Sequence, residues 1–246
     1  YLWESAAAEL ANAARATPAD TAVYLDRRFV EGWPSVPFLL GDRPATPFDA
    51  ANPPATITGP AVIFAWPYDP LDALAAAVVA PARVAVEPGP LARGDLEPQP
   101  YPLYTRYTIT PGAAGSPPAA NFDNRFHLMA ALAHPAPDSV TIDLAWAADA
   151  ARPADELLPQ RFIHVTGPEG MLAQHDGPIG RGLWPASGWR PLLRVAERHT
   201  LALPRPFDPA TDAVTVGLYD PTSGRRLPLI DDGAPPGDAF VVPPGR

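Results

Sequence analysis

The sequence predicts an α+β protein of two domains, a small α/β domain followed by an antiparallel β-sandwich of the immunoglobulin or jelly-roll kind. The first observation behind this prediction is the content of proline and glycine, 36 and 18 of 246 residues. Because proline lacks a backbone N–H and fixes φ, this composition disfavours long helices and favours short strands joined by turns. The other two observations are a helix–strand order in the first 111 residues and an apolar–polar alternation after residue 120.

The first domain is expected over residues 1–111. An alanine-rich helix is predicted over 1–16, and Thr17-Pro18 ends it because the residue before a proline avoids the helical conformation. Asp69 followed by Pro70 is typical of a helix start, which places a second helix over 71–79. Strands are expected over 22–26, 36–40, 61–65, 82–87 and 101–109.

Residues 112–120 are the expected linker, because they are small, uncharged and rich in turn formers. The second domain is expected over 121–246, where apolar residues recur with a period of two. The core-facing residues of its first two strands are predicted to be Phe126, Leu128, Ala130, Leu132, Val140, Ile142, Leu144 and Trp146. Further strands are expected over 160–166, 195–203, 213–219, 225–229 and 239–242. About eight short strands separated by turns are typical of a β-sandwich.

The composition excludes several classes of chemistry. All 18 basic residues are arginine, and the sequence has no cysteine. Without lysine the chain lacks the phosphate-binding residue of a P-loop ATPase and the amine of a Schiff-base enzyme. Without cysteine it has no thiolate nucleophile, disulfide or cysteine-ligated metal site. The net charge of −9 argues against nucleic acid or an anionic membrane surface as a partner.

The motifs predict no catalytic residue, no metal ligand and no cofactor. The five histidines do not have the spacing of a zinc motif, and no serine lies in a G-x-S-x-G pattern. Asp220, Asp231, Asp232 and Asp238 are interpreted as turn residues rather than calcium ligands. The glycine-rich segment 177–182 does not stand between a strand and a helix, so it is not expected to bind a nucleotide phosphate.

The segment Leu172–Arg198 is expected to be a long surface loop, because a buried loop would leave its backbone polar groups unpaired. Its two tryptophans either form an exposed platform for sugar rings or close one end of the sandwich as core residues. Tyr219 joins them, since the alternation within strand 213–219 leaves it pointing outward. The candidate carbohydrate-binding residues are Trp184, Trp189 and Tyr219 for stacking, and His175, Asp176 and Arg190 for hydrogen bonds to hydroxyl groups.

Several stretches of the chain resemble one family of proteins. In the second domain they are Phe162–Val165, Gly170–Asp176, the Trp-Pro-x-Ser-x-Trp-x-Pro pattern of 184–191, and Val216–Gly224. They are similar to the C-terminal domain of bacterial polytopic membrane glycosyltransferases of the GT-C group, which resemble dolichyl-phosphate-mannose protein mannosyltransferases and aminoarabinose transferases. Ala22–Leu40 resembles the soluble α/β segment that follows the last membrane helix of such proteins. Where the family has an acidic residue after its Trp-x-Pro step, this chain has Leu192-Leu193.

The resemblance implies a non-catalytic, extracytoplasmic domain of a membrane glycosyltransferase that uses a polyprenyl-phosphate sugar. The family's catalytic carboxylate lies between early membrane helices, which this sequence does not contain, so no catalytic residue is carried over. The chain starts at Tyr1 on a helical pattern and is expected to be part of a longer protein. Its expected partners are its own membrane domain and a glycan or protein acceptor. The alternatives are a structural or protein-interaction module that binds no sugar and, less directly, a free-standing hydrolase.

Overall fold

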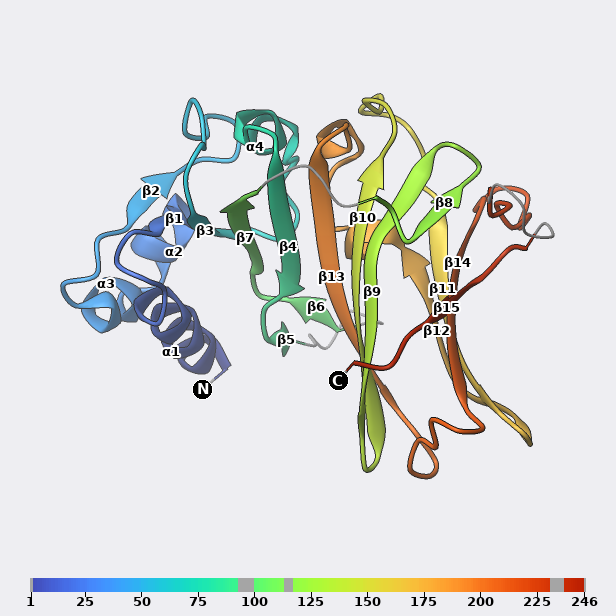
Figure 1. The fold of residues 1–246 in the computed structure, drawn as a ribbon. Helices are drawn as coiled ribbons and strands as arrows, with labels where there is room; N and C mark the ends of the chain where they lie inside the picture. The colour runs from blue at the N-terminus through green and yellow to red at the C-terminus, as the bar shows by residue number, and fades with distance from the viewer. Residues whose placement is uncertain (1, 93–99, 113–116, 231–236, 246) are drawn as a thin grey trace. The chain divides into compact units, whose positions relative to one another are not determined.

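The computed structural model describes residues 2–92, 100–112, 117–230 and 237–245, which form a β-rich α+β fold (Figure 1). The described residues fall into two compact units, one of 2–92, 100–112 and 183–185, the other of 117–182, 186–230 and 237–245. Leu183–Pro185 therefore pack with the first unit, although the sequence places them in the second domain. Residues 113–116 of the predicted linker lie outside the described residues, and its last residue, Ala120, already belongs to a strand.

The first unit contains a mixed sheet whose parallel part is central to the site described below. Its strands are β1 (Ala22–Asp26), β2 (Thr46–Phe48), β3 (Ala61–Ala65), β4 (Ala82–Pro88) and β7 (Thr105–Pro111). Strand β1 pairs in parallel with β2 on one side and β3 on the other, and β7 lies antiparallel between β3 and β4. A short hairpin of β5 (Leu91–Ala92) and β6 (Tyr101–Pro102) completes the strands of this unit.

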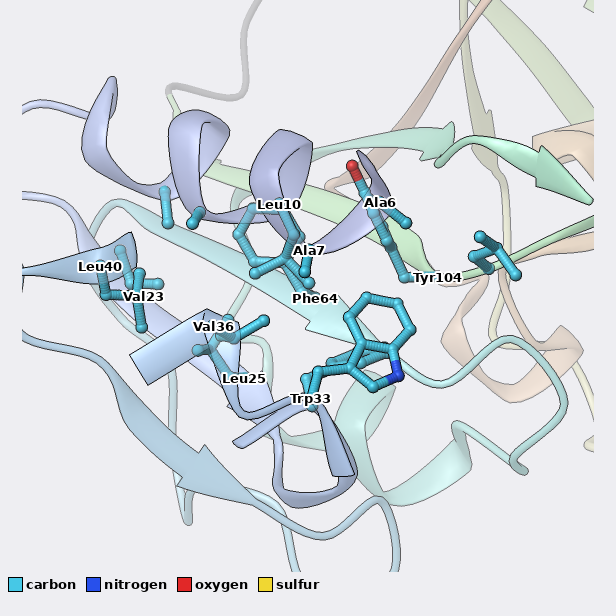
Figure 2. Close-up of a cluster of buried hydrophobic side chains, with 14 of the residues drawn as sticks. Ala6, Ala7, Leu10, Val23, Leu25, Trp33, Val36, Leu40, Phe64 and Tyr104 are labelled. Atoms are coloured by element: carbon cyan, nitrogen blue, oxygen red, sulfur yellow. The ribbon is translucent and has the colours of Figure 1, made fainter. Parts of the chain in front are cut away.

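Helices cover this sheet and bury its apolar side chains. They are α1 (Leu2–Arg15), α2 (Arg27–Gly32), α3 (Ser35–Leu40) and α4 (Asp72–Ala77). Helix α1 has one buried face of small residues and Leu10, which pack against α3 and the strands. Figure 2 shows this core, with Trp33 and Tyr104 lying at its edge. The core therefore combines four chain segments, within residues 6–14, 23–40, 62–64 and 92–104.

One sequence prediction in this unit is wrong, and another is wrong only in its cap. Residues 36–40, expected as a strand, are helical, and Pro37 is tolerated because the first turn of a helix does not use its backbone N–H groups. The second helix, expected over 71–79 with Asp69 as its cap, is present as α4, but its N-cap is Leu71 and it has no side-chain cap. The Asp69 carboxylate instead binds an arginine of another segment.

The second unit consists of two antiparallel groups of strands. One has the order β13-β10-β9-β8, with β8 (Ala120–Phe122), β9 (Phe126–Ala136), β10 (Ser139–Ala148) and β13 (Leu193–Ala202). The other has the order β12-β11-β14-β15, with β11 (Gln160–Gly167), β12 (Gly170–Pro178), β14 (Ala213–Tyr219) and β15 (Phe240–Val242). Two short 3₁₀ segments, η1 (Ile179–Gly182) and η2 (Ala186–Gly188), lie between β12 and β13.

The predicted loop Leu172–Arg198 is wrong in its extent, because β12 and β13 occupy its two ends, residues 172–178 and 193–198. The β12 segment alternates poorly between apolar and polar residues, since it is an edge strand with little buried surface on either face. The predicted strand over 225–229 is also absent from the described residues, where isolated bridges join Arg226 to Tyr219 and Leu229 to Phe122.

A β-bulge changes the inward face of β9. Alternation holds in β10, where Val140, Ile142, Leu144 and Trp146 are buried as predicted. The pairing between β9 and β10 shifts by one residue next to Trp146, so Ala131 and Ala133 turn inward and Leu132 is exposed. A bulge places two residues opposite one and reverses the side-chain phase beyond it. The predicted burial of Ala130 and Leu132 is therefore wrong.

Among the described residues, no helix is long and apolar enough to cross a membrane.

Candidate ligand-binding site

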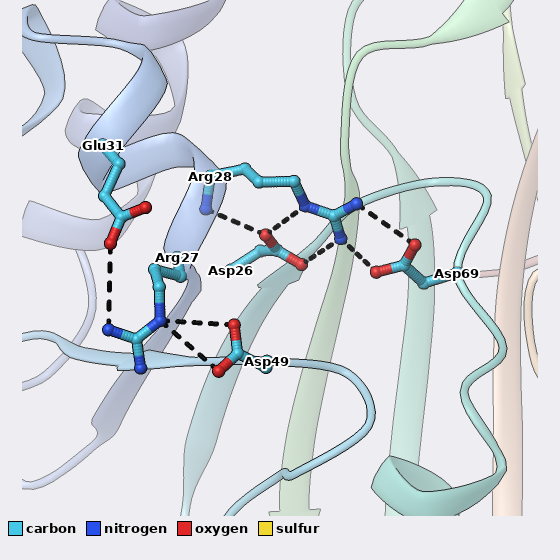
Figure 3. Close-up of polar contacts among 6 residues, drawn as sticks. All are labelled: Asp26, Arg27, Arg28, Glu31, Asp49 and Asp69. Carbon is cyan, nitrogen blue, oxygen red and sulfur yellow. Dashed lines mark hydrogen bonds and ion pairs between the residues drawn. The ribbon is translucent and has the colours of Figure 1, made fainter.

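Three aspartates gather where the parallel strands of the first unit end. Asp26 is the last residue of β1, Asp49 directly follows β2, and Asp69 lies four residues beyond β3. Because parallel strands present their carboxyl ends at one edge of the sheet, ligands of open α/β sheets commonly bind there. Figure 3 shows these three carboxylates converging on the two arginines that open α2. This edge is therefore a candidate ligand site.

Arg28 is held by two carboxylates. Its Nε and Nη2 donate to the two oxygens of Asp26 at 2.8 and 2.7 Å, and its Nη1 donates to Asp69 Oδ1 at 3.2 Å. Nη2 also contacts Asp69 Oδ2. Asp26 is buried and caps α2 as well, since it accepts the backbone N–H of Arg28 at 3.0 Å. These hydrogen bonds, led by the one to Asp26, raise the pKa of Arg28 further, so its charge is permanent.

Arg27 forms a second, more exposed pair beside the first. Its Nε donates to Asp49 Oδ1 at 3.2 Å, and its Nη1 lies 3.8 Å from Glu31 Oε1 one helical turn away. Both partners are solvent-exposed, so this pair contributes little to stability. The Arg27 pair resembles the contacts of Arg28 with Asp26 and Asp69 (the Arg28 clamp), but it contains no buried carboxylate.

An aromatic row connects the Arg28 clamp to a pocket. The Arg28 guanidinium lies over the Trp66 ring, 4.8 Å from its centroid. Phe29 stands between the two tryptophans, with its ring centroid 5.5 Å from Trp66 and 4.9 Å from Trp33. Phe29 also meets the edge of Tyr104 at 6.3 Å, which anchors the row in the core. The indoles therefore have fixed positions before any ligand arrives.

A pocket of about 390 Å³ opens beside this row. Its lining residues are Glu4, Gly32, Trp33, Pro34, Ser35 and Trp66. Trp66 is half-buried and Trp33 is 9% exposed, so both indoles contribute part of their surface to the wall. A side chain built on Gly32 would meet no atom within 4 Å of its first carbon, so this part of the pocket is open. The volume lies within the range of about 300–1,000 Å³ that is usual for small-molecule sites.

The chemistry of this pocket favours binding over catalysis. Glu4 and Ser35 supply hydrogen-bonding oxygens, and the indoles supply apolar surface, a combination that matches the hydroxyl groups and C–H faces of a sugar. The neighbouring carboxylates Asp26 and Asp69 are both engaged by Arg28, so neither is available as a general base in this arrangement. Within the described part of the chain, no group of three or more metal-binding side chains is placed to hold an ion.

Trp184 and Trp189, the centre of the predicted sugar platform, are core residues. They are 2% and 0% exposed, respectively. Trp184 packs against Tyr107 in the first unit, with ring centroids 5.6 Å apart, while Tyr107 donates a hydrogen bond to the Leu183 carbonyl at 2.6 Å. Trp189 meets Phe126 edge-on at 5.8 Å in the second unit. Neither ring has a face for a ligand, and the prediction of an exposed platform is wrong for both.

The other predicted contact residues are distributed over the second unit. His175 and Asp176 are exposed on the edge strand β12, Tyr219 is half-buried at the end of β14, and Arg190 is half-buried before β13. Burial lowers the pKa of the Arg190 guanidinium. The structure does not bring these four side chains together around a pocket among the described residues. His175 takes part in a larger polar cluster.

That cluster is a buried network around Glu197, which the sequence did not suggest. Glu197 Oε1 accepts hydrogen bonds from Trp146 Nε1 at 2.9 Å and from Arg161 Nε at 3.2 Å. Its other oxygen accepts the backbone N–H of Arg181 at 3.1 Å and lies 3.0 Å from His199 Nε2. Arg161 and Glu197 come from strands β11 and β13 of the two strand groups, so their ion pair joins these groups.

The network also fixes a strained turn and reaches the surface at His175. Arg181 has a φ of 58°, a left-handed conformation that is rare outside glycine, and the hydrogen bond to Glu197 holds it there. Arg161 Nη1 lies 3.0 Å from His175 Nδ1 and donates to the His175 carbonyl at 3.2 Å. The His175 and His199 rings are 4.8 Å apart. Every charged group in this interior therefore has a partner of opposite charge or a polar neighbour.

Burial sets the protonation states of the network. It lowers the pKa of His199 to about 4, against the opposing effect of Glu197, so His199 is neutral at pH 7. Burial also opposes ionisation of Glu197, but its contacts with His199, Arg161 and Trp146 outweigh burial and hold its pKa below the usual range. Burial and the Arg161 charge lower the pKa of His175. The network thus contains the Glu197 carboxylate and the Arg161 guanidinium, and the Arg181 guanidinium is close enough to lower the pKa of both histidines as well.

The acidic residues interpreted as turn formers lie in turns where they are described. Asp220 Oδ1 accepts the backbone N–H groups of Thr222 at 3.0 Å and Ser223 at 2.8 Å, which closes the turn after β14. Asp238 pairs with Arg226 at 3.2 Å. Asp231 and Asp232 lie outside the described residues.

Sequence reasoning missed the pocket, although one pattern pointed to it. Each of the three parallel strands ends in an aspartate or is followed by one within four residues, namely Asp26, Asp49 and Asp69. Strand β2 contains Pro47 and has only three residues, so it was not predicted and the pattern stayed incomplete. The wall residues Trp33 and Trp66 lie 33 positions apart, and no local pattern relates them.

Comparisons with known protein families and with curated protein sequences gave no match. Among solved structures, the chain is similar to a glycosyl hydrolase family 2 member from Bacteroides cellulosilyticus. The similarity has 12% sequence identity and a TM-score of 0.28, and it covers 58% of this chain and 16% of that protein. The chain thus spans a small part of that protein's length, and the function proposed below does not use this similarity.

Proposed function

We propose that this chain is a non-catalytic glycan-recognition region of a membrane-embedded glycosyltransferase, on the extracytoplasmic side. The observation that carries recognition is the pocket between Trp33 and Trp66, with Glu4 and Ser35 as its polar groups. The membrane glycosyltransferase as the parent protein is supported by the sequence resemblance to the GT-C group. In this proposal the pocket holds part of a glycan acceptor, and the transfer chemistry belongs to the membrane domain.

The proposal also gives each unit a separate role. The first unit is the small α/β domain that binds the ligand at the carboxyl ends of its parallel strands. The second unit is a β-sandwich, supported by its two antiparallel strand groups and by the Arg161–Glu197 ion pair that joins them. Its role is to provide a rigid support rather than a binding surface, because Trp189, its predicted sugar contact, is buried in its core.

A substitution that fills the pocket tests the proposal directly. Gly32→Leu adds a side chain where the structure has open space, so the fold is expected to tolerate it. Gly59→Leu is the matched control, because a side chain there also meets no atom within 4 Å and Gly59 does not line the pocket. The measurement is calorimetric titration of the full chain with methyl glycosides of glucose, mannose and galactose and with their disaccharides.

We expect at least one of these sugars to bind the unmodified chain and the Gly59→Leu chain, and to lose binding by about tenfold or more in Gly32→Leu and Trp66→Ala. Tyr68→Ala serves as the aromatic control, because Tyr68 is exposed nearby without lining the pocket. If no sugar binds, or if Gly32→Leu binds as well as Gly59→Leu, the pocket is not a glycan site. The rival interpretation, an interaction module without sugar binding, then stands.

A further inference from the structure

The charges around the pocket determine which sugars it accepts, given that the pocket binds glycans as proposed above. The cluster in Figure 3 contains four acids and two arginines, a formal charge of −2, and Glu4 in the pocket wall adds another negative charge. The whole chain carries −9. A ligand with its own negative charge is repelled by this surface before it makes any contact.

Arg28 is a cation next to the pocket, and Asp26 and Asp69 engage four of the five N–H groups of its guanidinium. It lies on Trp66, which lines the pocket. Its planar fork would suit a carboxylate or a phosphate, but Nε and Nη2 serve Asp26 while Nη1 and Nη2 serve Asp69. An anionic sugar that took two parallel hydrogen bonds from this fork would have to displace one of these aspartates. The buried Asp26 also caps α2, so Asp69, whose side chain is 25% exposed, is the one nearer to solvent.

The groups that line the pocket favour a ligand without negative charge. The Glu4 carboxylate only accepts hydrogen bonds, and the Ser35 hydroxyl both donates and accepts. Sugar hydroxyl groups can donate to Glu4, whereas a carboxylate or phosphate on the ligand would face it with like charge. Burying a carboxylate without a partner in a pocket with tryptophan walls carries a further cost.

We propose that the Trp33–Trp66 pocket selects uncharged sugars and excludes sugars that carry a carboxylate, phosphate or sulfate group, and that Asp69 sets this selectivity by occupying Arg28. Asp69 is then a specificity-determining residue that acts through Arg28 rather than by touching the ligand. Neutralising Asp69 frees part of the Arg28 guanidinium for other hydrogen bonds. It also makes the electrostatic potential at the pocket less negative.

Matched pairs of sugars test this selectivity in the full chain. Methyl glucoside is compared with methyl glucuronide, and the galactose and mannose pairs are treated in the same way, by calorimetry at low salt. We expect the neutral member of each bound pair to bind at least about tenfold more tightly than the acidic member, and the ratio to shrink in 1 M NaCl because salt screens exposed charges. Asp69→Asn is expected to tighten uronide binding about tenfold, with the neutral sugar changing less than threefold.

Asp49→Asn is the matched control, because it removes the same charge from the Arg27 pair and leaves Arg28 untouched. It is expected to change uronide binding less than threefold. Equal binding of neutral and acidic sugars by the unmodified chain overturns the inference, as does an equal effect of Asp49→Asn and Asp69→Asn. If no sugar of either kind binds, the proposed glycan function fails instead. Thermal unfolding of each variant establishes that the first unit remains folded.

Discussion

Both units contain an arginine held by acidic side chains, and the two arrangements differ in burial. Arg28 and its partner Asp69 lie at the surface beside a pocket, with side-chain exposures of 45% and 25%. Arg161 and Glu197 lie in the interior, with exposures of 1% and 0%. The same kind of ion pair therefore serves different purposes. The exposed pair shapes the potential of a site that a ligand can reach, while the buried pair holds two groups of strands together.

The largest expected difference between the two regions is in stability. Glu197→Ala leaves the Arg161 charge buried without its partner, so we expect a loss of about 3–5 kcal/mol in the free energy of unfolding. Asp69→Ala removes a partner from an exposed arginine that keeps Asp26, so we expect about 1 kcal/mol or less. Urea unfolding of the full chain, followed by circular dichroism, gives both values. Equal losses in the two variants would contradict the comparison.

A double substitution separates the buried charge from the packing of the buried pair. Arg161→Met with Glu197→Met removes both charges together, and apolar side chains of similar length fill the space. We expect this double variant to be more stable than Glu197→Ala, because it leaves no charge unpaired. Both variants lack the Glu197 oxygens that accept hydrogen bonds from Trp146 and Arg181, so the comparison isolates the unpaired charge. A double variant that is less stable than Glu197→Ala would contradict this expectation.

The second expected effect is a loss of stability in mild acid. The pKa of His199 is about 4 in the folded chain and about 6.5 when unfolded, so the unfolded state binds the extra proton between these values. The contribution of His199 is thus complete above pH 6.5 and is lost as the pH falls toward 4, by about 3 kcal/mol in all. Glu197, Arg161, Arg181 and His175 are the charged or titratable groups around it.

Unfolding curves between pH 7 and pH 4 measure this effect. His199→Gln keeps a polar side chain of similar size and is expected to flatten the dependence on pH. His164→Gln, at a half-buried histidine outside the network, is the control and is expected to leave most of the dependence in place. A dependence that is unchanged in His199→Gln would show that other groups cause it.

The smallest expected effect belongs to the exposed pair of Arg27. Asp49→Asn is expected to change the free energy of unfolding by about 0.5 kcal/mol or less, because both side chains of this pair are about half exposed. The same urea unfolding experiment measures it. A loss comparable to that of Glu197→Ala would mean that exposure does not separate the two kinds of network.

Local patterns in the sequence predicted much of the fold. The bounds of β1, β3 and β14 match the expected 22–26, 61–65 and 213–219, because each is a short apolar or alternating run between turn residues. The prediction of a strand over 36–40 is wrong because five apolar residues fit a buried helix as well as a strand. The prediction of which β9 residues face the core is wrong beyond the bulge, because a bulge depends on the partner strand and cannot be recognised in the sequence of β9.

The candidate site was beyond local patterns for a different reason. Asp26 and Asp69, which both pair with Arg28, are 43 positions apart. Arg161 and Glu197, which pair with each other, are 36 positions apart. Only the tertiary structure brings these residues together. Trp184 and Trp189 were singled out because they are large aromatics among turn residues. The same features are found in core anchors, and burial alone separates the two roles. The six predicted contact residues therefore did not locate the pocket.

Hydrogen–deuterium exchange of the full chain, with and without the tightest-binding neutral methyl glycoside or disaccharide of the titrations, tests the central claim most directly. The claim is that the exposed network frames a ligand site while the buried one is only structural. Added sugar is expected to slow exchange in peptides covering 28–35 and 62–69, and to leave peptides covering 160–167 and 193–202 unchanged. Protection confined to the second pair of segments, or no protection anywhere, would contradict the claim.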